Sequence, residues 1–252
     1  MTGPVTGQWI TVPTADGAID AYLAVPEGPG PAADSLPVVV VLQEIFGVNA
    51  HIREVTERIA AEGYVAIAPA LYHRLAPGFE AGYTAEDIQV GRQYKEQTQA
   101  AQLLGDIQAA IAIAQDHPRA KAGGVGCIGF CFGGHGAYLA ATLPEVAATA
   151  SFYGAGIVNW CPGGGAPTVS RTGQIGGEIW CFFGTADASI PPDHIATIKT
   201  ALEQAAIAHR ILTYDGADHG FFCDRRGSYH PTAAADAWEQ VKTLFAHLAV
   251  DP

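Results

Sequence analysis

A cysteine in a glycine-rich turn is the sharpest chemical signal in the sequence. The run from Gly129 to Gly134 reads Gly-Phe-Cys-Phe-Gly-Gly, with a short apolar segment before it and a segment of small residues after it. This is the strand–turn–helix setting of a nucleophile elbow, whose glycines are needed because side chains beside the strained nucleophile would collide with strand or helix. The following helix N-terminus would favour a thiolate at Cys131 and any oxyanion formed beside it. Taken alone, the motif fits a buried structural cysteine about equally well.

A carboxylate and an imidazole occur further along the chain, each directly after a predicted strand. Asp187 follows the strand predicted for residues 178–183, and His219 follows the one predicted for 211–214. The carboxyl ends of parallel strands share one edge of a sheet, where ligands bind, so both side chains are expected near Cys131. Asp187 could instead cap a turn, and His219 could bond only to loop backbone. The order nucleophile, acid, base is that of α/β-hydrolases and favours a Cys131–His219–Asp187 triad.

The loop after an earlier buried strand is the predicted source of further site groups. The β-branched run 38–42 predicts a strand buried on both faces, and Glu44 and Ile45 follow it. An oxyanion hole needs two backbone N–H donors, for which we expect Phe132 in the elbow and Ile45 in this loop. A glutamate directly after so apolar a strand stands out, although a lone carboxylate in a loop is usually solvated.

Length, composition and net charge indicate which fold class and which kinds of partner suit this sequence. The 252 residues are 49% hydrophobic and 15% charged, which suits one large α/β domain over residues 1–252, although two small domains would also fit the length. The formal net charge of -12 opposes binding to nucleic acid. A small anionic substrate is still compatible with this charge if a local arginine offsets the field.

The N-terminus and the cysteines indicate a cellular compartment. Residues 1–8 hold neither a basic residue nor an apolar run, so no signal peptide is expected, and residues 38–42 are too few to cross a bilayer. The five cysteines, an odd number without framework spacing, are expected as free thiols of a reducing compartment. Cys127 and Cys131 lack a second ligand pair at zinc spacing, so no metal site is expected. These features predict a soluble cytoplasmic protein without membrane contact.

Strand-like and helix-like segments alternate, which predicts an α/β fold: a mostly parallel sheet with helices on both faces. The strands are expected at residues 9–12, 19–25, 38–42, 64–68, 124–128, 148–153, 178–183 and 211–214. The helices are expected at residues 50–62, 85–115, 133–143, 195–202 and 231–248. The glycine-rich segment 154–177 is expected to be a long loop inside the domain.

The sequence also allows three other interpretations. Residues 124–129 match G-x-G-x-x-G, but a dinucleotide site needs this motif after the first strand, whereas here it overlaps a late strand and the elbow. Metal-dependent hydrolysis could use the Asp-His pairs at 193–194 and 218–219 with His230, but these share no helical ligand spacing. A hydrolase-like fold could also serve only as a binding module, because fold does not prove function.

Motifs spread from about Trp9 to Leu248 resemble those of the dienelactone hydrolase (carboxymethylenebutenolidase) family. They are Gln43-Glu44-Ile45-Phe46-Gly47-Val48-Asn49, the Gly-Phe-Cys-Phe-Gly-Gly elbow, Tyr153-Gly154, Gly184-x-x-Asp187-x-x-Ile190-Pro191 and His219-Gly220-Phe221. The resemblance implies a cofactor-free, cytosolic α/β-hydrolase. It also implies a reaction, the opening of a carboxylated dienelactone to maleylacetate during the degradation of chlorinated or hydroxylated aromatic compounds. A general small carboxylesterase with another substrate is the alternative.

The resemblance further implies roles for single residues. Cys131 would be the nucleophile, His219 the base and Asp187 its orienting acid. Glu44 resembles the family's carboxylate that helps to form the thiolate. Further residues expected to contact the substrate are Phe46 and Tyr153.

The expected binding of a substrate carboxylate follows the family pattern only in part. Arg74 matches an arginine that holds this group, but the position of a second arginine, four residues after the catalytic histidine, is Cys223. Arg225 or Arg226 could replace it. The sequence leaves open the roles of Cys161 and Cys223, and whether the protein is a monomer or a homodimer.

Overall fold

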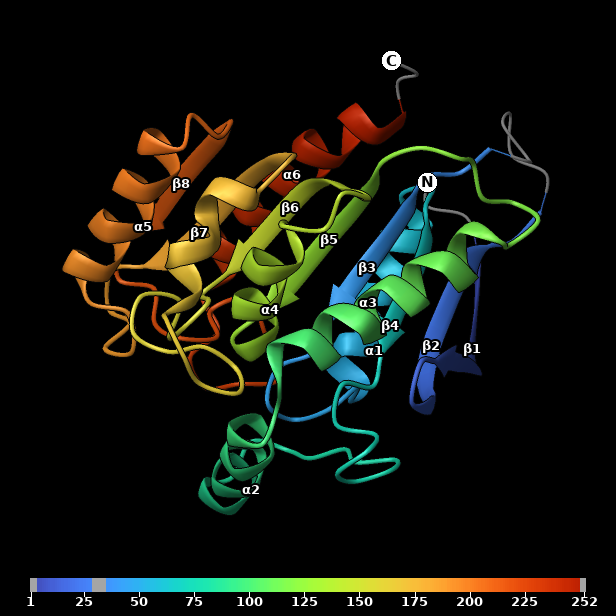
Figure 1. The fold of residues 1–252 in the computed structure, drawn as a ribbon, viewed down its shortest axis with the longest axis horizontal. Coiled ribbons are helices and arrows are strands. Elements are labelled where there is room, and N and C mark those ends of the chain that lie inside the picture. Colours follow the sequence, from blue (N-terminus) through green and yellow to red (C-terminus); the bar gives the residue numbers. More distant parts are fainter. Residues whose placement is uncertain (1–3, 29–34, 250–252) are drawn as a thin grey trace.

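An eight-stranded sheet runs through the computed structural model, which describes residues 4–28 and 35–249. Its strands lie in the order β1-β2-β4-β3-β5-β6-β7-β8 (Figure 1). The pairs β1–β2 and β2–β4 are antiparallel, and all pairs from β4 to β8 are parallel. The strands are β1 (Val5–Thr14), β2 (Gly17–Pro26), β3 (Val38–Leu42), β4 (Val65–Pro69), β5 (Val125–Phe130), β6 (Val146–Phe152), β7 (Glu178–Gly184) and β8 (His209–Tyr214).

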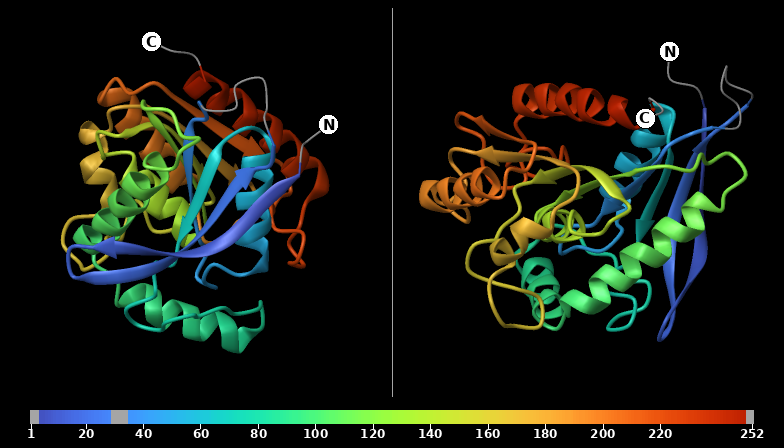
Figure 2. Two further views of the ribbon diagram at one scale, coloured as in Figure 1. Left: turned by 90° about the vertical axis from the view of Figure 1, so that its right-hand side faces the viewer. Right: turned by 45° about the horizontal axis from the view of Figure 1, so that its top comes forward.

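Helices cover both faces of this sheet (Figure 2). The helices α1 (Ala50–Ala61) and α6 (Pro231–Ala249) pack on one face, and α3 (Ala100–Gln115) and α4 (Phe132–Ala140) pack on the other. The other helices are α2 (Ala85–Glu96), α5 (Pro192–Gln204) and the 3-10 helix η1 (Thr168–Gln174). This arrangement confirms the predicted α/β-hydrolase fold with a mostly parallel sheet.

The side chains of strand β3 pack against the helices on both faces of the sheet. All five of its residues are buried. Because side chains alternate along a strand, Val39 and Val41 join the apolar cluster of α1 and α6, while Val38 and Val40 join that of α3 and α4. Burying each such side chain stabilises the fold by about 1.5–3 kcal/mol. A continuous β-branched run is therefore needed here, as predicted.

The single helix predicted for residues 85–115 is two helices, α2 and α3, which corrects that prediction. At the break, the hydroxyl of Thr98 donates to the carbonyl of Lys95 at 2.6 Å. The N–H of Ala100 donates to the carbonyl of Pro162 at 3.1 Å. These bonds replace the helical ones, since threonine competes readily for backbone partners. As a result α2 stands apart from the sheet, whereas α3 lies on it (Figure 1).

The predicted loop at residues 154–177 is irregular except for η1. A buried histidine of α4, His135, holds it in place. Its Nε2 lies 2.7 Å from the Thr168 hydroxyl, and its Nδ1 lies 3.0 Å from the carbonyl oxygen of Ala155. Burial lowers the pKa of His135 to about 4, so the ring stays neutral and serves as a structural hydrogen-bonding group.

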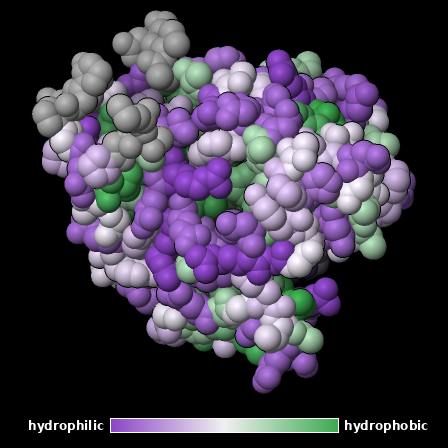
Figure 3. Space-filling view, turned by 180° about the vertical axis from the view of Figure 1, so that it is seen from behind, coloured by the Kyte–Doolittle hydropathy of each residue, from purple (hydrophilic) through white to green (hydrophobic). Residues whose placement is uncertain are grey.

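The outer surface of α1 and α6 is polar. Figure 3 shows the face opposite to that of Figure 1, where hydrophilic residues dominate and hydrophobic ones are scattered. The apolar residues of both helices face the sheet instead. Within the described ranges, no helix combines the length and the apolar character that a membrane span requires.

Candidate active site

Cys131 lies in a sharp turn between β5 and α4, as the motif predicts. Its backbone has φ 55° and ψ -115°, a conformation that costs a non-glycine residue about 1–3 kcal/mol. A Cβ on Gly129 would collide with the carbonyl of Gly133, and a Cβ on Gly134 with that of Phe152. The N–H of Cys131 donates to the same Phe152 carbonyl at 3.0 Å and ties the turn to β6. The glycines are therefore required by the close approach of backbone on both sides.

Asp187 and His219 follow β7 and β8 and meet at this edge of the sheet. The Nδ1 of His219 lies 2.8 Å from Oδ2 of Asp187. Asp187 is 4% exposed, and its Oδ1 accepts the N–H of Ser189 at 2.8 Å. A carboxylate held in this way keeps the proton on Nδ1 and leaves Nε2 to act on a thiol.

The electrostatics at His219 favour its protonated form. Burial lowers the pKa of His219, but the negative charge of the Cys131 thiolate and the hydrogen bond to Asp187 outweigh burial and raise it to about 10. The arrangement can therefore form a thiolate and return its proton.

A cavity of about 400 Å³ opens over the thiol and the imidazole. Six residues singled out from the sequence line it: Cys131, His219, Ile45, Phe46, Phe132 and Arg226. The other lining residues are Ile88, Arg92, Lys95, Glu96, Ala155 and Ser189. Phe132 is the first residue of α4, so its N–H has no acceptor within the helix and is available to a ligand.

The wall of this cavity is locally basic, in contrast to the net charge of -12. Arg92 and Lys95 enter from α2, and the ammonium of Lys95 lies 4.3 Å from the ring centroid of Trp160. Burial lowers the pKa of Lys95. The sequence analysis missed both residues. Their spacing, two basic residues three apart on one helix, was the signal that could have found them.

Glu44 is buried beneath the cavity and paired with an arginine. It is 1% exposed, and its Oε1 accepts a hydrogen bond from Arg226 at 2.9 Å. Its Oε2 has no hydrogen-bond partner in residues 4–28 and 35–249. Burial lowers the pKa of Arg226, but the carboxylate of Glu44 and other nearby negative groups outweigh it and raise the pKa. Arg225, the other arginine that the sequence left open, pairs with Glu54 on the surface.

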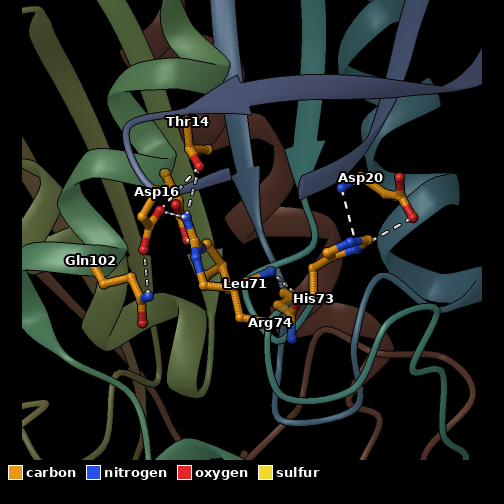
Figure 4. A network of polar contacts seen from close by, with 9 residues as sticks. Thr14, Asp16, Asp20, Leu71, His73, Arg74 and Gln102 are labelled. Atoms are coloured by element: carbon orange, nitrogen blue, oxygen red, sulfur yellow. Dashed lines mark hydrogen bonds and ion pairs between the residues drawn. The ribbon is translucent and has the colours of Figure 1, made fainter. Parts of the chain in front are cut away.

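Arg74 is not part of this cavity, which corrects its predicted role at the substrate carboxylate. Figure 4 shows its guanidinium beside Thr14 and Asp16, at the end of β1 and in the turn after it. One nitrogen lies 2.6 Å from Oδ2 of the buried Asp106, and the other lies 2.9 Å from the hydroxyl of Thr14 and also bonds Asp16. The hydrogen bond from Arg74 lowers the pKa of Asp16 to about 2. Through these bonds Arg74 links β1, α3 and the turn after β4.

Tyr153, which was expected to contact the substrate, lies behind the imidazole and does not line the cavity. It has φ 36° and is fully buried. Its ring packs edge-on against His219, with centroids 5.2 Å apart. Its hydroxyl is buried and, among the described residues, finds no hydrogen-bond partner. In this arrangement Tyr153 supports His219 from below.

Comparisons with known proteins agree with this geometry. The model of the Dienelactone hydrolase family matches residues 19–249. A protein of Synechocystis sp., named as a candidate carboxymethylenebutenolidase, is 54% identical over 97% of this chain and 98% of its own length. A Bradyrhizobium protein, named as a candidate 2-oxo-3-(5-oxofuran-2-ylidene)propanoate lactonase, is 29% identical over 94% of this chain and 92% of its own length.

A solved structure is also similar to this chain. The crystal structure of a candidate dienelactone hydrolase from Klebsiella pneumoniae matches with a TM-score of 0.87 and 32% identity, over 97% of this chain and 99% of that one. A family match over most of the chain and a relative at 54% identity together settle the membership. The protein belongs to the dienelactone hydrolase family, a group of lactone and ester hydrolases with the α/β-hydrolase fold.

Proposed function

We propose that the protein opens lactones, or cleaves esters, that carry a carboxylate, with Cys131 as nucleophile, His219 as base and Asp187 as its orienting acid. The observation that carries this proposal is the basic cavity over a thiol and an imidazole whose far nitrogen lies 2.8 Å from a buried carboxylate. We propose that one hydrolase domain, residues 1–252, does this on a small-molecule substrate. By family, the favoured substrate is a dienelactone opened to a maleylacetate-type product in the breakdown of aromatic compounds.

The first half-reaction would form a thioester. The sulfur of Cys131 attacks the lactone carbonyl carbon while Nε2 of His219 takes the thiol proton. The carbonyl electron pair moves onto oxygen, where the N–H groups of Ile45 and Phe132 stabilise the charge. As the carbonyl reforms, the ring C–O bond breaks and the ring oxygen takes the proton from His219. The opened chain is then attached to Cys131 through its acyl carbon.

The second half-reaction would release the acid. His219 removes a proton from water, and the hydroxide attacks the thioester carbon. The same two N–H groups stabilise the second oxyanion. Its collapse breaks the C–S bond, and the sulfur recovers the proton from His219. In the overall reaction, a lactone and water give a hydroxy acid. Where the lactone is a dienelactone, the released hydroxyl group is an enol, which tautomerises to the keto acid.

Arg226, with Arg92 and Lys95 beside it, is the proposed site for the substrate carboxylate, in place of Arg74. Arg226 faces both the cavity and Glu44. A substrate carboxylate that binds Arg226 would compete with Glu44 for the guanidinium. Glu44, deprived of its partner in a buried position, would then accept the thiol proton of Cys131 first and pass it to Nε2 of His219, which delivers it to the ring oxygen. Activation of the nucleophile would thus depend on an acidic substrate.

The test of the proposed function is a hydrolysis screen with three substrate groups: carboxylated butenolides, neutral lactones and activated aryl esters. We expect turnover of the carboxylated butenolides, with kcat/KM above that of the neutral lactones. Preference for neutral esters would favour a general carboxylesterase. Absence of turnover on all three would favour a binding module and overturn the proposal.

The choice between the arginines gives a second prediction. Arg226→Gln and Arg92→Gln should each lower kcat/KM for acidic lactones by about 10- to 100-fold, because a charge-assisted hydrogen bond contributes about 1.5–3 kcal/mol. Neutral aryl esters should be affected far less. Arg92→Gln serves as the matched variant, because Arg92 does not pair with Glu44. Arg74→Gln should change both substrate classes equally and lower the melting temperature, since it leaves Asp106 buried without its partner. A selective loss on acidic lactones with Arg74→Gln alone would reverse this assignment.

The role of Glu44 gives a third prediction. Glu44→Gln keeps the shape of the side chain but cannot take up a proton. We expect kcat on acidic lactones to fall by about tenfold or more, and the rate of Cys131 alkylation to change its pH profile, since a nearby negative charge is removed. If turnover and alkylation profile both stay as in the wild type, Glu44 is a bystander and its loop acts only through the N–H of Ile45.

A further inference from the structure

A second group of ligating side chains lies outside the catalytic cavity. His51 stands at the start of α1, and Cys223 and Asp224 lie in the loop between β8 and α6. One ligand atom from each of the three lies within 4.8 Å of the other two. His51 and Cys223 are buried, whereas Asp224 is exposed. His51 and Asp224 also line a separate cavity of about 230 Å³.

His51 has a buried nitrogen with nothing to bond. The residue is 3% exposed, and its Nε2 has no hydrogen-bond partner among the described residues. The ring lies edge-on to Phe130 and Phe222, at 6.0 and 6.3 Å between centroids. A neutral imidazole carries a lone pair on one ring nitrogen, and this is the form in which histidine binds a metal ion. Buried polar groups are nearly always paired, so Nε2 is available to a water molecule or to a metal ion.

The surroundings of His51 favour a cation over an anion. Three carboxylates, those of Glu44, Asp224 and Glu54, act on it, and only Arg58 opposes them among the charges that bear on its pKa within the described residues. Glu54 and Asp224 also line the same 230 Å³ cavity. Arg58 lines this cavity as well, and Glu54 is paired with Arg225, so the carboxylate that would meet an incoming positive ion is that of Asp224.

The thiol of Cys223 is buried and hydrogen-bonded. Its Sγ donates to the hydroxyl of Tyr83 at 3.3 Å. A metal ion beside the sulfur would replace this proton, because a coordinating thiol is deprotonated outright.

We propose that His51, Cys223 and Asp224 bind one Zn²⁺ ion, with a water molecule from the 230 Å³ cavity as fourth ligand. Nitrogen, thiolate and carboxylate oxygen are the donors that zinc takes in proteins, whereas Mg²⁺ and Ca²⁺ take oxygen. Zinc–ligand bonds of about 2.0–2.3 Å in a tetrahedron set the donors about 3.3–3.8 Å apart. The donors, which lie within 4.8 Å of one another, must therefore approach by about 1 Å, and Asp224, the exposed member of the group, has the most freedom to move. Binding forms a Zn–S bond and releases the Cys223 proton to solvent.

This site is separate from the catalytic thiol and from the histidines weighed as metal ligands in the sequence, at positions 194, 219 and 230. It gives a role to Cys223, which replaces the family arginine four residues after the catalytic histidine. It does not depend on the proposed hydrolase activity.

The test uses the full-length, reduced and metal-stripped protein, with Co²⁺ as a spectroscopic probe and Zn²⁺ as competitor. Cys131→Ala is measured beside the wild type, since the Cys131–His219 pair could itself take a metal. In both proteins we expect one Co²⁺ to bind per chain with release of about one proton and with a thiolate-to-cobalt charge-transfer band, which Zn²⁺ abolishes by displacing the Co²⁺. Cys223→Ser should lose the band, and His51→Gln should weaken binding at least tenfold.

Two further variants control for folding. Cys161→Ser removes another buried thiol and should leave the band unchanged. Asp224→Asn alters an exposed side chain, so it should keep the fold and the band but weaken Co²⁺ binding several-fold. A band that survives Cys223→Ser, a metal affinity unaffected by both His51→Gln and Asp224→Asn, or no band in the wild type would overturn the proposal.

Discussion

Replacing Cys131 with alanine is expected to abolish hydrolysis, with a fall in kcat/KM of about 10⁴-fold or more. The sulfur would form the bond to the acyl group, and no other thiol of the described residues lines the cavity. Alanine keeps a Cβ, so the backbone at φ 55° experiences the same strain and the melting temperature should change little. Steady-state rates on a carboxylated butenolide and on an activated aryl ester give the measurement.

A matched control separates chemistry from the loss of any thiol. Cys161→Ser should retain wild-type rates, because Cys161 is buried outside the cavity. Iodoacetamide should label Cys131 before Cys127 and Cys181, which are fully buried in strands, and burial raises the pKa of Cys181 to about 12. Retention of more than a few per cent of activity in Cys131→Ala would rule out a cysteine nucleophile.

The elbow could be predicted from sequence because its constraints are local. The atoms that a side chain on Gly129 or Gly134 would strike belong to the same turn or to the adjoining strand. The meeting of Asp187 with His219, 32 residues apart, could also be predicted, since parallel strands bring their carboxyl ends to one edge. The order of the motifs along the chain, together with the parallel topology, therefore predicts which distant residues meet.

The proposed anion site could not be predicted because it depends on contacts without a local pattern. Arg74 matched a family position, yet its acceptors Asp16 and Asp106 lie 58 and 32 residues away and occupy its donors. Arg225 and Arg226 are neighbours in an irregular loop, and their side chains point in different directions. Arg225 pairs with Glu54 on the surface, whereas Arg226 pairs with the buried Glu44. The basic residues of α2 reach the cavity only because the chain breaks before Ala100, where no proline or glycine marks the break.

Replacing His219 with alanine is expected to lower kcat/KM by about 10³- to 10⁴-fold, and Asp187→Asn by about 10²- to 10⁴-fold. His219 would carry the proton in both half-reactions, whereas Asp187 holds the ring so that Nε2 is the free nitrogen. An asparagine can present its N–H₂ group to Nδ1 and favour the wrong tautomer. His194→Ala and His230→Ala are the controls: a metal-dependent hydrolase would need them, and the triad would not.

The pH dependence of Cys131 alkylation distinguishes the role of Asp187 from a merely structural one. The Asp187 carboxylate raises the pKa of His219, so Asp187→Asn should lower it. A less basic imidazole holds the proton less firmly, so the imidazolium–thiolate pair is less populated near neutral pH. The alkylation profile of Asp187→Asn should therefore shift to higher pH, while Asp215→Asn, an exposed carboxylate that bonds Thr185, should leave it unchanged. A variant at Asp187 that lost turnover without this shift would show that the carboxylate holds the loop and does not tune the base.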